Sequence, residues 1–303
     1  MRGLIIRGTR NTFTVRLGGE ELECPLKGKV LRGAEGYYNP LAPGDLVEVE
    51  PEGRSGRGLI LGLEKRRNSF TRFNQKGLAP QLLAANVDLV LCVTTPGAPP
   101  FRPRFLDRLL VQAERAEIPA AVLLNKADLG AEEPDTAERL EDYCRIGYPV
   151  LRVSARSGAG MEGLRSFIEG KCSVLAGQSG VGKSSLIKAL APGLEIRIGA
   201  LNEKYDRGNH TTTQGILLDI PGGARIIDTP GIRRFVPDGV EPGELGLYMR
   251  EFAPLWGQCT YGASCSHRSE PGCKVLEAVD AGVIHEDRYE SFLRIREELT
   301  GHG

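Results

Sequence analysis

Eight consecutive residues near the middle of the chain have the types and spacing of a phosphate-binding loop. They match the pattern G-x-x-x-x-G-K-[ST] and are Gly177, Gln178, Ser179, Gly180, Val181, Gly182, Lys183 and Ser184. Glycines let successive backbone N–H groups turn toward phosphate oxygens, the lysine can reach the β- and γ-phosphates, and the serine hydroxyl can ligate Mg²⁺. We therefore predict a nucleoside triphosphate site rather than a glycine-rich turn with a chance lysine.

The segments on either side of this loop are the elements that would position it. Residues 172–176 form a short apolar run that predicts a buried strand, and residues 185–190, beginning with Ser185, have the spacing of a helix. A strand before and a helix after the glycines are what the motif requires, because the positive end of the helix then points at the phosphates.

A second motif, Asn125, Lys126, Ala127 and Asp128, reads Asn-Lys-x-Asp and directly follows the apolar run 120–124. This is the guanine-reading motif of GTPases. The aspartate carboxylate accepts hydrogen bonds from guanine N1–H and N2–H₂, which adenine does not offer, so adenine would leave a charge unpaired. The motif therefore predicts guanine specificity.

A third motif follows the predicted strand 150–153. Ser154 and Ala155 occupy the place where GTPases have Ser-Ala-Lys and where a backbone N–H contacts the guanine O6. Arg156 stands at the third position, and the change leaves a backbone contact unaffected. We expect Ser154 and Ala155 to line the base.

Two further segments have the features of GTPase switches. The strand 224–228 ends in Asp-x-x-Gly, in which Asp228 would hold Mg²⁺ and the Gly231 N–H would contact the γ-phosphate. The polar stretch 199–215 is long for a passive connection. It contains three consecutive threonines, of which we take the middle one, Thr212, as the Mg²⁺ ligand, with Thr211 and Thr213 as alternatives.

The residue that would orient the attacking water is less evident. Many GTPases place a glutamine just after Asp-x-x-Gly. Here the position is Ile232, which neither donates nor accepts a hydrogen bond. His210, beside the threonines, is the local candidate for a catalytic residue; the alternative is a switch-loop histidine that contacts RNA or stabilises the loop.

The motifs occur in an unusual order. In a Ras-like GTPase the phosphate-binding loop and both switches precede the guanine-reading motif, whereas here residues 125–128 and 154–155 come first. The set is complete and circularly permuted, a change that folds tolerate because domain termini often lie close together. The chain therefore leaves the GTPase domain just after the second switch, which links this switch to the C-terminal segment.

The remaining sequence predicts two flanking domains. Residues 1–66 show short period-two runs separated by Gly and Pro turns, which predict a small closed β-barrel of the OB type. Residues 1–76 carry 14 Lys and Arg against 9 Asp and Glu, an excess that fits RNA and equally a merely solvated surface. Residues 67–237 would form the α/β GTPase domain and 238–303 a small helical domain.

Three cysteines and a histidine cluster in this last segment. Cys259, Cys265, His267 and Cys273 lie in a turn-rich stretch, and four such ligands suit one closed, structural Zn²⁺ site. We expect helices at 244–252 and 274–299 on either side. Four other cysteines are scattered, and because no secretory signal is evident, we expect no disulfides.

Taken together, these motifs make the chain resemble the ribosome small-subunit-dependent GTPase A family over essentially its whole length. Further matches are residues 67–69, 210–213, 270–273 and 288–291. The spacing between Cys259 and Cys265 departs from the family pattern by one extra residue.

The resemblance implies a factor in late maturation of the 30S subunit that binds 16S rRNA. It implies slow GTP hydrolysis that speeds up on the subunit, and release after hydrolysis to GDP. Since no apolar run approaches the length of a membrane span, we expect a cytoplasmic protein with no membrane partner. We also expect a monomer. Two alternatives are an RNA-binding assembly module whose GTPase acts as a timer, and a metabolic kinase, which the guanine-reading motif disfavours.

Overall fold

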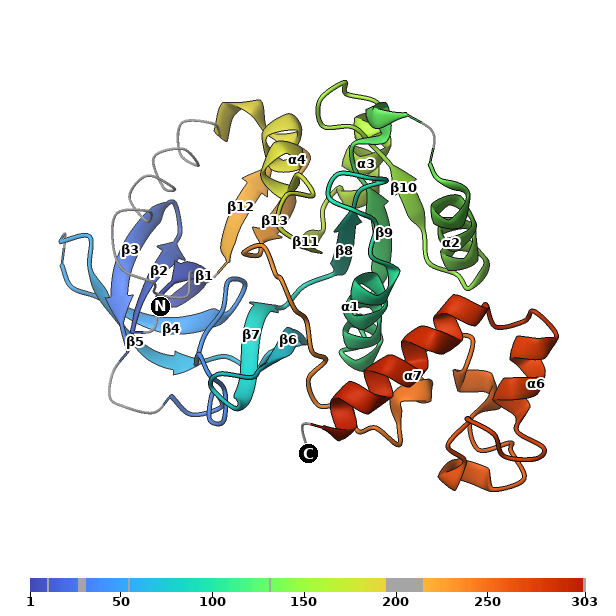
Figure 1. Ribbon diagram of the computed structural model, residues 1–303. Helices are drawn as coiled ribbons and strands as arrows, with labels where there is room; N and C mark the ends of the chain where they lie inside the picture. Colours follow the sequence, from blue (N-terminus) through green and yellow to red (C-terminus); the bar gives the residue numbers. More distant parts are fainter. Residues whose placement is uncertain (10, 27–30, 54, 131, 195–214, 302–303) are drawn as a thin grey trace.

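The computed structural model describes residues 1–9, 11–26, 31–53, 55–130, 132–194 and 215–301. At the N-terminal end, five short strands curl into a closed barrel (Figure 1). They are β1 (Arg2–Gly8), β2 (Thr12–Leu17), β3 (Glu20–Pro25), β4 (Leu46–Pro51) and β5 (Gly58–Leu63). Antiparallel pairing gives the order β3-β2-β1-β4-β5, and bridges between Glu23 and Arg57 and between Leu26 and Ile60 close the ring. A closed barrel is therefore present, and its OB type stays a prediction.

The barrel forms because alternate side chains on these strands are apolar and point inward. Phe13, Val15, Val47, Val49 and Ile60 are all fully buried in one cluster. Their polar neighbours along each strand face outward, as in the alternating burial of β4.

A two-stranded hairpin, β6 (Ser69–Asn74) and β7 (Ala79–Ala85), follows the barrel. Its Phe70 and Leu83 are buried against the core of the next domain, and Phe70 stacks on Phe235 with ring centroids 5.8 Å apart. The hairpin thus packs on the α/β domain.

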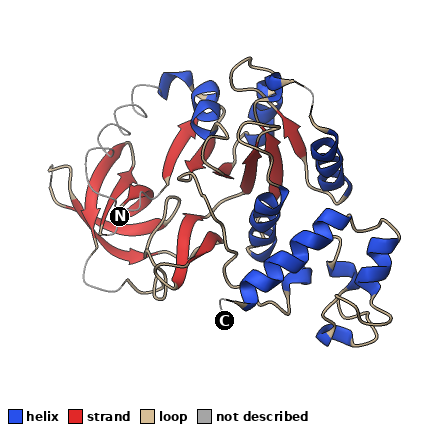
Figure 2. Cartoon of the chain, in the orientation of Figure 1, coloured by secondary structure: helices blue, strands red, loops and turns tan. Residues whose placement is uncertain are grey.

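The central domain is a sheet with helices on both faces (Figure 2). Its strands are β8 (Leu89–Thr94), β9 (Ala120–Leu124), β10 (Val150–Arg152), β11 (Cys172–Gly177), β12 (Ile216–Ile220) and β13 (Ala224–Asp228). The order is β10-β9-β8-β11-β13-β12, parallel except for β12. Helices α1 (Pro103–Arg115) and α2 (Pro134–Arg145) share one core with the sheet, and α3 (Met161–Ile168) and α4 (Lys183–Leu190) share the other.

Burial on both faces of the sheet explains why the sequences of these strands are continuous apolar runs. Along β8, Val90 and Cys92 face the α1 side while Leu89, Leu91 and Val93 face the α4 side. The strands predicted at 120–124, 150–153, 172–176 and 224–228 and the helix predicted at 185–190 are all present, to within a few residues at each end.

One feature was not predicted: the barrel and the central sheet are hydrogen-bonded into a single sheet. Strand β12 pairs with β13 on one side and meets β1 antiparallel on the other, at Arg7 and Ile216. An ion pair of 2.6 Å joins Arg16 of β2 to Asp219 of β12. The strand that follows residues 195–214 is thus fixed directly to the barrel.

The C-terminal segment is helical only in part. The expected helix at 244–252 is wrong: this segment contains one 3-10 turn, Leu245–Tyr248, and Gly246 lies so close to the Trp256 ring that an added Cβ would be 2.1 Å from it. The expected helix at 274–299 is two helices, α6 (Lys274–Asp280) and α7 (Glu286–Thr300). Gly282, at φ +69°, separates them, and the His285 side chain accepts the Asp287 N–H at the start of α7.

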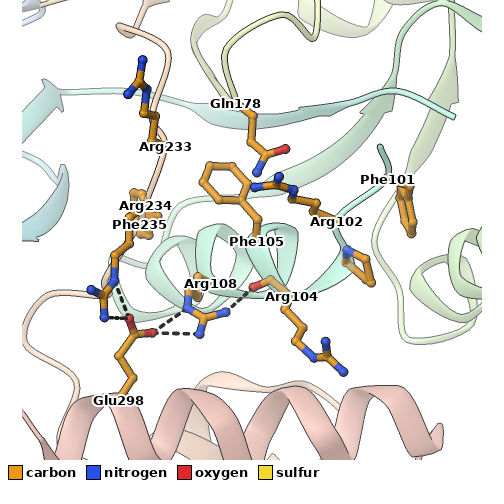
Figure 3. Close-up of a pocket in the computed structure, with 11 residues that line it drawn as sticks. Phe101, Arg102, Arg104, Phe105, Arg108, Gln178, Arg233, Arg234, Phe235 and Glu298 are labelled. Atoms are coloured by element: carbon orange, nitrogen blue, oxygen red, sulfur yellow. Dashed lines mark hydrogen bonds and ion pairs between the residues drawn. The ribbon is translucent and has the colours of Figure 1, made fainter. Parts of the chain in front are cut away.

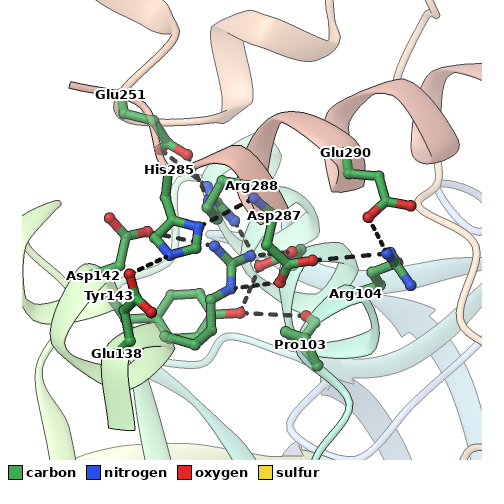
Figure 4. Close-up of polar contacts among 12 residues, drawn as sticks. Pro103, Arg104, Glu138, Asp142, Tyr143, Glu251, His285, Asp287, Arg288 and Glu290 are labelled. Carbon is green, nitrogen blue, oxygen red and sulfur yellow. Dashed lines mark hydrogen bonds and ion pairs between the residues drawn. The ribbon is translucent and has the colours of Figure 1, made fainter. Parts of the chain in front are cut away.

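Buried charges anchor α7 to the central domain (Figure 4). Arg288 donates to Asp107 of α1 at 2.7 Å and to Glu251 at 2.5 Å, and Arg139 of α2 donates to Asp107 at 2.7 Å. The Tyr143 hydroxyl also donates to Asp107, at 2.6 Å. Burial raises the pKa of Asp107, but the two arginines outweigh it and hold the pKa below its usual value. The carboxylate is therefore ionised and fully paired.

Among the described residues, no helix is both long and apolar enough to cross a membrane.

Candidate nucleotide site and metal cluster

The predicted nucleotide motifs meet at one edge of the central sheet. Register places Gly177 of β11 beside Val93 of β8, Thr94 beside Leu124 of β9, and Leu175 beside Asp228 of β13. The five parallel strands therefore end together, and the loops that carry the motifs leave from this shared edge. Strand order reverses between β8 and β11, which is where open α/β sheets place ligands.

Two glycines of the phosphate-binding loop are fixed by close contacts. A Cβ at Gly177 would lie 2.6 Å from the Val93 carbonyl oxygen, and a Cβ at Gly182 would lie 2.4 Å from the Asn125 side-chain nitrogen. Gly180 and Gly182 also adopt positive φ values of 84° and 90°. The glycines are thus needed for the path of the backbone, which ends at the N-terminus of α4.

Lys183 lies inside the loop rather than in solvent. Its side chain is buried, and Nζ donates to the carbonyl oxygens of Gly177 at 3.0 Å and Gln178 at 3.2 Å. Burial lowers its pKa, against the opposing effect of Asp228. Ser184 and Ser185, one residue further along, are exposed at the start of the helix. The Ser184 hydroxyl is therefore open at the mouth of the loop, while the Lys183 ammonium is held inside it by the loop carbonyls.

Asn125 connects the guanine-reading motif to the other two motifs. It is buried; its amide donates to the Val181 carbonyl at 2.9 Å and accepts the Ala155 N–H at 3.2 Å. Ala127 is held in turn, because its N–H donates to the Val153 carbonyl at 3.0 Å. One side chain thus fixes the spacing of all three loops.

The structure adds a contact that the sequence did not reveal. Lys126, at φ +64°, extends along the phosphate-binding loop and donates to the carbonyls of Gly180 at 2.8 Å and Ala98 at 2.6 Å. Ala98 belongs to the connection between β8 and α1, where Thr95 donates to the Pro99 carbonyl at 2.6 Å. No local pattern marked this connection as part of the site.

Asp128 is positioned by Ser154. The Ser154 hydroxyl donates to Asp128 Oδ1 at 2.6 Å and accepts the Ser157 N–H at 3.0 Å. This hydrogen bond is the main cause that lowers the pKa of Asp128. The carboxylate is ionised, oriented and open to solvent, as an acceptor for two base N–H groups must be.

Asp228 and Gly231 lie against the phosphate-binding loop. A Cβ at Gly231 would be 3.0 Å from the Ser179 Cα, so this glycine touches the loop directly. Burial raises the pKa of Asp228 to about 6, although Lys183 opposes the shift. Asp228 Oδ1 is buried and has no hydrogen-bond partner among the described residues, as expected of an oxygen that binds a cation or its water.

Two predicted residues cannot be placed. His210 and Thr212, with Thr211 and Thr213, lie outside the described residues. Ile232 is described: its side chain is buried in the core and its N–H donates to the Gly177 carbonyl at 3.3 Å. It therefore has no part in contacting water.

The C-terminal cysteines and histidine converge as predicted. All four are buried, and their ligand atoms lie within 4.8 Å of one another. The sulfurs of Cys259 and Cys273 are 3.9 Å apart, and a tetrahedral ion with Zn–S bonds of about 2.3 Å would place them about 3.8 Å apart. His267 presents Nδ1, 3.3 Å from the Cys273 sulfur. The segment between Cys259 and Cys265 contains the 3-10 turn Gly262–Ser264.

Comparisons with known proteins agree with this arrangement. Residues 63–236, more than half of the chain, match the family model described as RsgA GTPase. The chain belongs to the RsgA GTPase family. It is 38% identical over 98% of its length to the small ribosomal subunit biogenesis GTPase RsgA of Bacteroides fragilis, and covers 97% of that protein. It is 42% identical over 95% of its length to the Azotobacter vinelandii protein of the same name, with 83% of that protein covered.

Solved structures agree with the RsgA assignment. YjeQ from Thermotoga maritima superposes with a TM-score of 0.74 at 34% identity, covering 99% of this chain and 98% of that one. YloQ, described as a circularly permuted GTPase, has a TM-score of 0.68 at 26% identity, covering 100% of this chain and 96% of that one. The predicted family and the permuted order of the GTPase motifs are both confirmed.

Proposed function

We propose that this chain hydrolyses GTP during maturation of the small (30S) ribosomal subunit. The full-length relationship to small ribosomal subunit biogenesis GTPases carries the proposal. It is supported by Asp128, an oriented carboxylate at the same sheet edge as the phosphate-binding loop.

The nucleotide contacts follow from the geometry. Asp128 pairs with guanine, and the backbone of residues 154–155 lies at the base. Residues 177–185 surround the phosphates with backbone N–H groups, and the positive end of α4 adds to the field there. Lys183 exchanges its loop carbonyls for the β- and γ-phosphate oxygens when GTP binds.

Hydrolysis proceeds by direct attack of water on the γ-phosphate, with no covalent enzyme intermediate. Lys183 and the loop N–H groups stabilise charge on the phosphoryl oxygens, and the Gly231 N–H contacts the γ-phosphate. Bound Mg²⁺, held by Ser184, Asp228 and Thr212, would neutralise phosphate charge. Since Ile232 is buried, His210 is our candidate for orienting the water.

The two flanking domains would serve binding and stability. We assign residues 1–66 as an OB-type barrel that contacts 16S rRNA, residues 67–237 as the GTPase domain, and residues 238–303 as a domain held by one structural Zn²⁺ on Cys259, Cys265, His267 and Cys273. Such an ion would add folding free energy and leave no open position for catalysis. The protein would act in the cytoplasm as a monomer, without a membrane partner.

The direct test is steady-state GTP hydrolysis by the full-length protein, with and without purified small ribosomal subunits. We expect slow release of inorganic phosphate alone and at least tenfold faster release with subunits. The large subunit serves as the control and should have no effect. Equal rates under all three conditions would contradict the ribosomal role, while phosphate found on an acceptor other than water would indicate a kinase.

A further inference from the structure

A cavity of about 360 Å³ lies between the phosphate-binding loop, the start of α1, the segment after Gly231 and helix α7 (Figure 3). Apart from Gln178 of the phosphate-binding loop, none of its lining residues has a role in the nucleotide site described above. Gln178 lines one side, Phe101 and Arg102 line another, and the far side is closed by Arg234 and Glu298. Its volume lies in the range of small-ligand sites.

The cavity is strongly basic. Five of its lining residues are arginines and one is a glutamate. Glu298 is shared by two of these arginines: Arg108 donates to one carboxylate oxygen at 2.8 Å and Arg234 to the other at 2.6 Å. A single carboxylate between two guanidinium groups leaves one positive charge uncompensated.

Two further guanidinium groups add to this charge. Arg102 and Arg233 are exposed, and within the part of the chain that the structure describes their side chains make no hydrogen bond or ion pair. Arg102 directs its guanidinium into the space beside the Phe105 ring, whereas Arg233 lies at the margin. The cavity therefore offers an unpaired planar donor, which suits a phosphate.

Aromatic side chains supply the other half of the site. Phe101 is half-buried at the rim and Phe105 is buried in the floor. Phe101 is not stacked on any other described aromatic ring. Guanidinium groups alone would suit any anion, including an acidic peptide. A guanidinium and a partly exposed phenyl ring that line one cavity are a combination that binds a nucleotide of a single strand, with its base stacked and its phosphate paired.

The cavity is also lined by the phosphate-binding loop and by the segment after Gly231, which follows the second switch. Gln178 is the second residue of the phosphate-binding loop, and its amide points into the cavity toward Arg102. Arg234 follows Gly231 by three residues and holds Glu298 of α7. An occupant would therefore contact the loop, the second switch and the C-terminal helix at once.

We propose that this cavity binds one unstacked nucleotide of a single-stranded RNA segment, with the base against Phe101 and the phosphate on Arg102. The proposal rests on the proposed function, because small-subunit RNA is the strand that the protein would meet. It would couple RNA binding to the nucleotide bound in the GTPase site, because Gln178 belongs both to the phosphate-binding loop and to the wall of the cavity.

The test compares full-length Arg102→Gln and Phe101→Ala with Lys188→Gln, a control that removes one exposed cation from α4. Two probes are used: purified small ribosomal subunits and a labelled single-stranded RNA of about 12 nucleotides. We expect affinity for both to fall about tenfold in either cavity variant and to stay unchanged in the control. In Arg102→Gln, the slope of log affinity against log salt should also become shallower by about 0.7, as for one lost phosphate contact on a single strand. A folding defect alone would not change this slope in that way.

The outcomes separate this site from the proposed function. If wild-type protein binds subunits but the cavity variants match Lys188→Gln on both probes, the RNA site is wrong and the ribosomal role stands. If wild-type protein does not bind subunits but binds the RNA in an Arg102-dependent way, the RNA site stands and the ribosomal role is wrong. If a glutamate-rich peptide displaces the RNA and Phe101→Ala has no effect, the occupant is an acidic protein segment, which would overturn the proposal.

Discussion

Ser154 donates a hydrogen bond of 2.6 Å to Asp128, across 26 positions of sequence, and so fixes the carboxylate that the guanine-reading motif depends on. The two residues meet because β9 and β10 are adjacent and parallel and end together. The hydroxyl lowers the pKa of Asp128 and so favours the ionised carboxylate.

Removing this hydrogen bond should weaken nucleotide binding without destroying the fold. In Ser154→Ala the Asp128 carboxylate loses its orientation, and we expect GTP affinity to fall about fivefold to tenfold, consistent with the loss of one charge-assisted hydrogen bond. Isothermal titration with GDP and GTP measures this. Ser157→Ala, which changes an exposed neighbouring hydroxyl, is the matched control. Equal affinities for the two variants would show that Asp128 needs no such support.

The contact between Gly182 and Asn125 predicts a larger effect. A methyl group at Gly182 would collide with the Asn125 amide. The alanine that carries it would also have to adopt a φ of +90°, which side-chain-bearing residues rarely do. We expect Gly182→Ala to reduce GTP affinity more than tenfold, because either the loop or Asn125 must move. Gly163→Ala on α3, where an added Cβ meets nothing within 4 Å, should bind GTP as the wild type does. Normal binding by Gly182→Ala would contradict the loop geometry described here.

The buried charges around Asp107 predict a stability effect with a defined pH dependence. Asp107→Asn removes the one buried carboxylate that Arg139 and Arg288 share, and we expect a loss of about 3–5 kcal/mol in the free energy of unfolding. The pKa of Asp107 is lowered in the folded protein, so its contribution is present above the unfolded pKa of about 4 and is lost as pH falls below it.

Urea denaturation between pH 3 and pH 8 therefore separates wild type from variant. Wild-type stability should fall more steeply than that of Asp107→Asn on the acid side. Asp280→Asn, an exposed carboxylate at the end of α6, should follow the wild type. If the free energy of unfolding falls equally steeply with decreasing pH in wild type and Asp107→Asn, Asp107 is not the charged partner of these arginines.

The cysteine cluster predicts dependence on a metal. Elemental analysis should find one zinc per chain, and a strong chelator should unfold residues 238–303, seen as increased amide exchange in α6. Cys265→Ser should lose zinc. Cys144→Ser, which changes an exposed cysteine far from the cluster in sequence, should retain it. Full zinc content in Cys265→Ser would contradict the proposed ligand set.

The sequence anticipated the features that local pattern determines. The glycine spacing of the phosphate-binding loop, the apolar strands of the central sheet and the cysteine–histidine cluster all depend on residues near one another in the chain, and each lies where it was predicted. Features that depend on distant pairing were missed. Nothing in β12 indicates that Ile216 would meet Arg7 of the barrel, or in Lys126 that it would reach Ala98.

The error at residues 244–252 has a different physical origin. The segment has apolar residues at helical spacing, but Gly246 packs closely against the Trp256 ring and Pro254 lies in the next 3-10 turn, Ala253–Leu255. Tertiary packing of a large ring against a glycine outweighed local helical preference. The cavity at Arg102 was missed for a similar reason, since its walls come from four separate parts of the chain.

The central claim is that this is a guanine-specific GTPase that acts on the small ribosomal subunit, and one experiment addresses both parts. Asp128→Asn replaces the base-reading carboxylate with an amide that complements xanthine instead of guanine. With small subunits present, we expect this variant to lose hydrolysis of GTP by at least a hundredfold and to gain subunit-stimulated hydrolysis of xanthosine triphosphate. Unchanged use of GTP by Asp128→Asn, or xanthosine triphosphate hydrolysis that small subunits do not stimulate, would contradict the account.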